Sequence, residues 1–157
     1  MKIIKVISCA ITIILMALIF FFSSQTAVES SAVSMGITYR VATFISKIVG
    51  GYNTETAVGV LENIIRTMAH FFLFFLLGIS VQNVLFRFSP KRHKKYFLWG
   101  FLFCVIYAVS DEIHQMFVPG RAAMLNDIVT DSTGAIVGIL LYILLAERIL
   151  RRYKNGN

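Results

Sequence analysis

Four long runs of apolar residues dominate the sequence, and each is long enough to cross a lipid bilayer as a helix. They cover about residues 3–22, 64–85, 96–118 and 127–146. A helix needs roughly 20 apolar residues, at ~1.5 Å each, to cross the ~30 Å hydrocarbon core. Charged residues make up only 15% of the chain, against about 25% in soluble proteins. We therefore predict an all-α, polytopic membrane protein whose residues 1–157 form one domain, a four-transmembrane-helix bundle.

The first run has two interpretations. Lys2 and Lys5 precede an apolar stretch, as they would in a cleavable signal peptide. The run is long for a signal core, however, and no small-residue cleavage site follows Phe22. We favour a retained helix that ends at Ser23-Ser24-Gln25, with cleavage as the alternative.

The third and fourth runs need polar residues to complete their helices. The purely apolar part of the third, residues 96–109, covers only ~21 Å. We expect this helix to continue to about Val118, where Pro119-Gly120 stops it. Asn126 is the expected N-cap of the fourth helix.

A longer connector, about residues 23–63, separates the first two runs. Apolar residues recur in it at helical spacing and predict an amphipathic helix that Gly50-Gly51 ends. This helix either lies on the outer membrane surface or packs on the bundle as an ordinary connector. The residues that carry the pattern are Ile37, Val41, Phe44, Ile45 and Ile48.

Basic residues predict the orientation. Eleven of the fifteen fall in three groups on one side of the four-span arrangement, and the positive-inside rule makes that side cytoplasmic. Both termini are then cytoplasmic in a multi-pass protein of the cell membrane. The net charge of +7 comes from this side, so the lipid bilayer accounts for it and no nucleic-acid partner is required. The groups are Lys2 and Lys5; Arg87, Lys91, Arg92, Lys94 and Lys95; and Arg148, Arg151, Arg152 and Lys154.

Polar and ionisable residues gather at one predicted depth. Counted from the nearest basic marker at ~1.5 Å per residue, His70, Asp111, Asp131 and the Ser23-Ser24-Gln25 end all lie ~24–27 Å away. The sequence thus predicts one polar layer near the outer boundary of the hydrocarbon. Gly134 and Gly138 form a GxxxG pattern on the face of Asp131, which lets a neighbouring helix approach closely.

Ionisable residues at this depth are costly and by default functional. The alternative is a network of ion pairs, such as Arg66 with Asp131 and Arg121 with Glu112, that only holds the helices in register. We favour a site that also binds a ligand. Its candidate binding residues are Gln25, Arg66, His70, Gln115, Arg121, Asp127 and Asp131.

The segment around these residues resembles the VanZ-like family. The resemblance lies in residues 107–121, Y-A-V-S-D-E-I-H-Q-M-F-V-P-G-R, with Asp127, Asp131, Gly134 and Gly138 after them. The Phe22–Gln25 and Arg66–His70 segments also fit the family pattern. The resemblance implies an integral membrane protein of the Gram-positive cell envelope, in a family linked to lowered susceptibility to lipoglycopeptide antibiotics such as teicoplanin.

Two functions from different classes follow. In the first, the layer binds a lipid-linked cell-wall precursor or a lipoglycopeptide without any cofactor, since arginine suits phosphate and carboxylate groups. In the second, an intramembrane hydrolase or transferase acts on a lipid-linked substrate, with Asp111, Glu112 and His114 as catalytic candidates. His114 or His70 would then be a general acid or base tuned by Asp111 or Asp131.

A divalent metal is compatible with these residue types, but their spacing is not diagnostic. The sequence has neither the H-E-x-x-H zinc motif nor a serine nucleophile elbow. The ionisable residues gather at one end rather than along a path, which argues against a monomeric pore. The sequence indicates no oligomeric state.

Overall fold

The computed structural model describes residues 2–49, 54–89 and 95–155, and these form five helices. The helix stop predicted at Gly50-Gly51 and the basic residues Lys91, Arg92 and Lys94 lie outside the described residues. The helices are α1 (Lys2–Ser23), α2 (Ala27–Val49), α3 (Thr54–Phe88), α4 (Phe97–Gln115) and α5 (Leu125–Asn155).

The predicted all-α class and the four apolar spans are confirmed. The spans are α1, residues 58–88 of α3, α4, and residues 125–148 of α5. At most 28% of the residues in any of their apolar windows are buried, and large side chains such as Ile106 (68% exposed) face outward. A surface this apolar fits contact with lipid better than contact with water.

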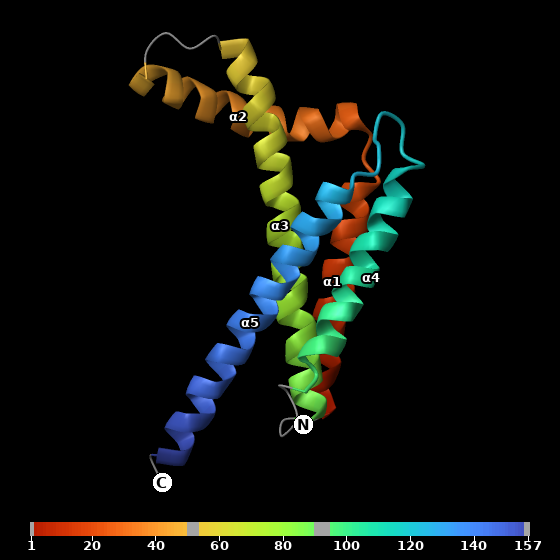
Figure 1. Cartoon of the computed structure of the whole chain (residues 1–157), viewed down its shortest axis with the longest axis vertical. Coiled ribbons are helices and arrows are strands. Elements are labelled where there is room, and N and C mark those ends of the chain that lie inside the picture. Colours follow the sequence, from red (N-terminus) through yellow and green to blue (C-terminus); the bar gives the residue numbers. More distant parts are fainter. Residues whose placement is uncertain (1, 50–53, 90–94, 156–157) are drawn as a thin grey trace.

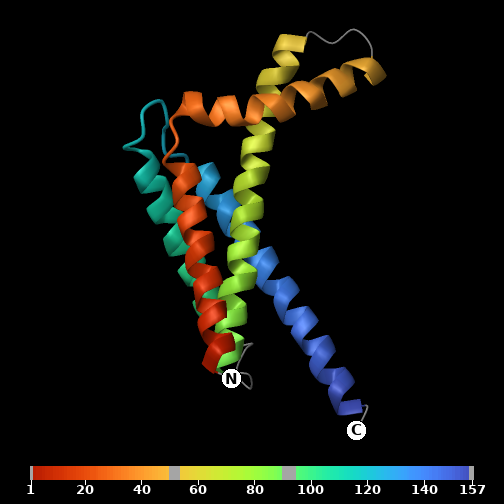
Figure 2. The same ribbon diagram turned by 180° about the vertical axis from the view of Figure 1, so that it is seen from behind.

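The helix α2 lies across one end of the bundle, and both chain ends lie toward the other end (Figure 1). We call these the α2 end and the terminus end. The view from behind shows the same crossing, and it shows α5 diverging from α1 toward the C-terminus (Figure 2). The termini thus share one end of the molecule, as an even number of spans requires.

A capping box starts α2. The Glu29 amide donates to Thr26 Oγ1 (3.3 Å), and the Thr26 amide donates to Glu29 Oε2 (2.9 Å). The hydrogen bonds that the Thr26 amide and hydroxyl donate to Glu29 Oε2 lower the pKa of the Glu29 carboxyl below its ordinary value. The predicted helix is confirmed. Among its described side chains, Thr38 and Ala42 are buried, and those of the predicted apolar stripe are exposed. Ile37 and Phe44 of that stripe are more than half exposed, which leaves them free to contact a membrane surface.

Glycine brings α3 and α5 into backbone contact. A Cβ atom added at Gly134 or Gly138 would overlap the carbonyl oxygen of Phe71 or Phe75, respectively. A Cβ atom at Gly78 would overlap the carbonyl oxygen of Ala135. The close approach predicted from the GxxxG pattern is therefore confirmed, and α3 is the neighbouring helix. We call these contacts of Gly78, Gly134 and Gly138 the glycine seam. The apolar core beside it consists of Ile19, Phe74, Leu77, Val81, Cys104, Ala108 and Ala135.

A polar cluster centred on the neutral amide of Asn83 links three helices toward the terminus end. Asn83 of α3 donates from Nδ2 to Ser8 Oγ of α1 (3.1 Å). Its Oδ1 accepts hydrogen bonds from Arg87 Nε (3.1 Å) and from the Tyr142 hydroxyl of α5 (3.0 Å). One amide thus satisfies donors and acceptors on α1, α3 and α5, and we call this group the Asn83 cluster.

Two helix boundaries differ from prediction. The helix α3 is longer than its span, because it begins at Thr54 and continues past the bundle to reach α2 (Figure 1). The helix α4 ends at Gln115, before the predicted Val118, because i→i−3 bonds from the Phe117 and Val118 amides (both 3.0 Å) tighten the chain there. The helix α5 begins at Leu125, so Asn126 lies in its first turn and is not its N-cap.

Candidate functional site

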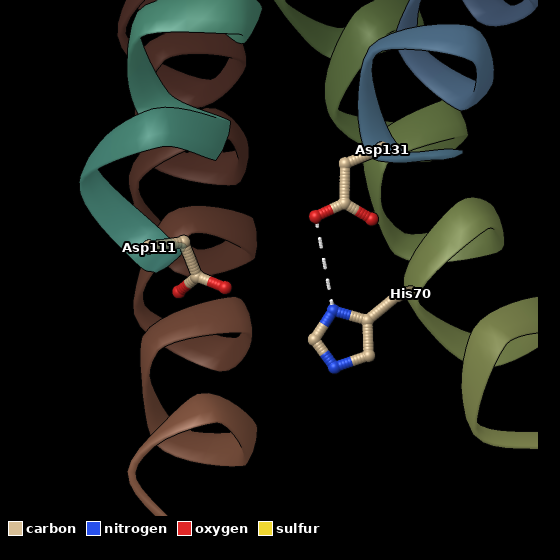
Figure 3. A group of neighbouring side chains, drawn as sticks. All are labelled: His70, Asp111 and Asp131. Carbon is tan, nitrogen blue, oxygen red and sulfur yellow. Dashed lines mark ion pairs between the residues drawn. The ribbon is translucent and has the colours of Figure 1, made fainter. Parts of the chain in front are cut away.

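A histidine of α3 and an aspartate of α5 face each other at the α2 end. His70 Nδ1 lies 3.9 Å from Asp131 Oδ2, and Asp131 is completely buried (Figure 3). The glycine seam places them together, because Gly134 lies one turn after Asp131 and holds α5 against Phe71, the residue after His70. The pair therefore depends on backbone packing that brings α3 and α5 close.

Asp111 joins this pair from α4. Its Oδ2 accepts hydrogen bonds from Ser23 Oγ at the end of α1 (2.6 Å) and from Gln115 Nε2 one turn further along α4 (3.1 Å). One ligand atom each from His70, Asp111 and Asp131 lie within 4.8 Å of one another. The depth count predicted that these residues share one level, and their grouping agrees with that level. We call His70, Asp111 and Asp131 the triad.

Arg121 folds back over the layer from the loop after α4. Gly120 adopts φ +77°, a backbone conformation that favours glycine, and the Ala27 amide donates to Pro119 O (3.4 Å). Arg121 then donates to Gln115 Oε1 and to the carbonyl oxygen of Phe22, both at 3.4 Å. Burial and the neighbouring Arg66 lower the pKa of the Arg121 guanidinium from its ordinary value. An anion between the two arginines would relieve this repulsion.

Glu112 and Asp127 have different surroundings. Glu112 is buried, and its Oε2 accepts a hydrogen bond from the Met124 amide (2.9 Å) just before α5 begins. Glu112 therefore positions the start of α5. This role differs from the catalytic role for which the sequence made Glu112 a candidate. Asp127 is half-buried and lines a narrow crevice with Arg66, His70 and Asp131.

The ion pairs expected of a purely structural network do not form. Within the described residues, neither Arg66 with Asp131 nor Arg121 with Glu112 comes within salt-bridge distance, and His70 with Asp131 is the pair that does. Buried oxygens of Asp111, Glu112 and Asp131 have no hydrogen-bond partner among the described residues. Groups that only hold helices in register would satisfy one another, so this arrangement favours a ligand site.

The two histidines occupy different environments. His70 faces the carboxylates, whereas the His114 ring stacks on Phe20 of α1 with ring centroids 4.3 Å apart. No salt bridge links His114 to a carboxylate among the described residues. The structure thus brings His70, and not His114, into contact with a carboxylate.

A pocket of about 330 Å³ opens beside His70, between α2, α3 and the turn after α1. Arg66, His70, Arg121 and Gln25 line it together with apolar side chains. Arg66 makes no hydrogen bond or salt bridge to any residue in the described part of the chain. The apolar lining includes Phe22, Ile37, Ile65, Phe72 and Leu73.

Ser23 is the residue that the candidate list lacked. It is completely buried, and its 2.6 Å bond to Asp111 joins α1 to the layer. The depth count places Ser23 at this level, but serines are common at helix ends, so its type alone gives no signal. Its orientation toward α4 depends on how the helices pack.

Comparison with known proteins identifies one relationship. The model of the VanZ/LLP1 family matches residues 8–146, which is most of the chain and includes every residue of the layer. No curated protein matches the chain, and no solved structure matches it.

Proposed function

Because this chain belongs to the VanZ/LLP1 family of membrane proteins, we propose that it acts at the outer face of the cytoplasmic membrane and lowers susceptibility to lipoglycopeptides such as teicoplanin. In this proposal it binds the anionic head group of a lipid-linked cell-wall precursor or of the antibiotic. The basic residues Lys2, Lys5, Arg87, Lys95 and Arg148, at or near helix ends toward the terminus end, support the orientation, because Lys/Arg-rich ends face the cytoplasm.

The pocket beside His70 is the observation that carries the proposal. Arg66 and Arg121 face it from α3 and from the loop before α5, and guanidinium groups bind phosphate or carboxylate through paired hydrogen bonds. The remaining wall is largely apolar, which suits the lipid part of an amphiphile. A lone guanidinium at this depth is costly unless an anion accompanies it.

The test is teicoplanin susceptibility in a Gram-positive host that lacks its own copy. We expect wild type to protect, and Asp111→Ala and Arg121→Ala to lose protection at matched membrane levels. Arg40→Ala is the matched control, because Arg40 is an exposed arginine of α2 outside the pocket lining. Equal protection by wild type and all three variants would mean that the layer has only a structural role. No protection by wild type would refute the resistance role.

A catalytic role is a second candidate, and the His70–Asp131 pair favours it. A histidine that lies beside a buried carboxylate is suited to general acid or base catalysis, and His70 also lines the pocket. Product formation from a polyprenyl pyrophosphate by purified protein, lost in His70→Gln, would establish this role. Binding without turnover would leave the first function in place.

A further inference from the structure

Three side chains from three different helices converge on one gap at the α2 end. His70 comes from α3, Asp111 from α4 and Asp131 from α5, and their side chains point toward one another (Figure 3). The exposed fractions are 14% for His70, 3% for Asp111 and 0% for Asp131. The gap is therefore closed to bulk water on the side of both carboxylates.

The carboxylate oxygens in this gap lack partners. Among the described residues, neither Asp131 oxygen accepts a hydrogen bond, and Asp111 Oδ1 and His70 Nδ1 are also unpartnered. A buried carboxylate without a partner is costly, so it either takes up a proton or binds a cation. A proton shared between His70 and Asp131 would draw the two atoms to about 3 Å. The observed separation is 3.9 Å.

The spacing fits an ion between the ligand atoms. Two atoms that each lie about 2.1 Å from one ion are at most about 4.2 Å apart. The His70–Asp131 separation of 3.9 Å is within this limit. The whole group, at 4.8 Å or less, requires a shift of at most about 0.6 Å to reach this limit.

Charge supports the same conclusion. The layer contains four carboxylates, Asp111, Glu112, Asp127 and Asp131, and two guanidinium groups, Arg66 and Arg121. With all four carboxylates ionised and the histidines neutral, two negative charges remain uncompensated, which is the charge that one divalent cation neutralises. Arg121 does not neutralise a carboxylate by direct contact, because its hydrogen bonds go to Gln115 and to Phe22 O.

We propose that His70, Asp111 and Asp131 bind a divalent transition-metal ion of the zinc or manganese class. One imidazole and two carboxylates suit such an ion, whereas calcium and magnesium prefer oxygen ligands alone. Three protein ligands leave a coordination position open. Because His70 also lines the pocket with Arg66 and Arg121, an anionic group in that pocket is placed to approach the ion. The proposal is independent of the head-group role, since ion binding is measured without any lipid.

The test is metal binding by purified full-length protein in detergent. Protein stripped with EDTA is titrated separately with Zn²⁺ and Mn²⁺ by calorimetry, and bound metal is measured after gel filtration. We expect one ion per chain and a rise in melting temperature on binding. Asp131→Asn and His70→Gln should each weaken binding more than about 100-fold, because loss of even an outer-shell partner costs 10–100-fold.

Glu62→Gln provides the control. It removes a half-buried carboxylate on α3 that lies eight residues, or ~12 Å, before His70, so affinity should change less than about threefold. Wild type that binds neither ion overturns the proposal, whatever the variants do. Equal affinity in wild type, Asp131→Asn and His70→Gln also overturns it, because the ion would then lie elsewhere.

Discussion

The Asn83 cluster and the triad are both polar groups in an apolar bundle, and they differ in how their hydrogen bonds are met. Asn83 uses its donor and its acceptor on Ser8, Arg87 and Tyr142, so the cluster needs nothing from outside. The triad consists of ionisable groups and leaves buried oxygens without partners in the described residues. A polar cluster whose hydrogen bonds are satisfied stabilises a fold, whereas an unsatisfied group of buried ionisable residues indicates a place for a ligand.

The largest effect on stability is expected from a substitution in the glycine seam between α3 and α5, on which both the Asn83 cluster and the triad depend. In Gly138→Ala the new methyl group meets the backbone of Phe75, which cannot move aside without separating α3 from α5. Overpacking of this kind costs about 1–3 kcal/mol or more, so we expect a large loss of thermal stability in detergent together with loss of function.

Gly59→Ala is the control for this variant, because nothing lies within 4 Å of a Cβ atom added there and alanine favours the helix. Equal melting temperatures for Gly138→Ala and wild type would contradict the close α3–α5 contact.

Removal of the Asn83 amide should affect stability alone. Asn83→Ala leaves the Ser8 and Tyr142 hydroxyls without this partner, at a cost of about 1–3 kcal/mol in the free energy of unfolding. Antibiotic susceptibility at matched membrane levels should not change. Asn63→Ala, at an exposed position of α3, should leave stability unchanged. A loss of function in Asn83→Ala at full membrane level would undo the division between the two groups.

Asp131→Asn should change stability in the opposite direction from Asn83→Ala. It keeps the shape of a buried carboxylate and removes its charge, so in EDTA we expect stability to rise by about 1 kcal/mol. Function should be lost, as expected when a site is held at the expense of stability. Chemical unfolding in EDTA, paired with the susceptibility assay, measures both quantities. A destabilised variant would show that Asp131 contributes to the fold as Asn83 does.

Periodicity and length predicted most of this fold. Apolar runs of the right length predicted four spans, and rise per residue predicted that His70, Asp111 and Asp131 share a level. These quantities repeat along a helix and can be counted in a sequence.

Rotation about each helix axis was not predictable in the same way. His114 and Asp111 are three residues apart on α4, yet one stacks on Phe20 and the other bonds Ser23. Which face of α4 meets α1 depends on packing between helices that are distant in sequence. The sequence left the placement of α2 open for the same reason, because Thr38 and Ala42 are its buried residues among the described side chains although larger apolar residues lie beside them.

The shortness of α4 links the layer to the thickness of the membrane. Its 19 residues span ~28 Å, slightly less than the ~30 Å of an average hydrocarbon core, and its polar residues occupy the last turn. The longer α3 and α5 can accommodate a thicker bilayer by tilting, but α4 requires lipids that thin around it. Lipid chain length therefore sets how far Asp111 and Gln115 lie from the aqueous boundary, and hydrophobic mismatch becomes a control on the hydration of the site.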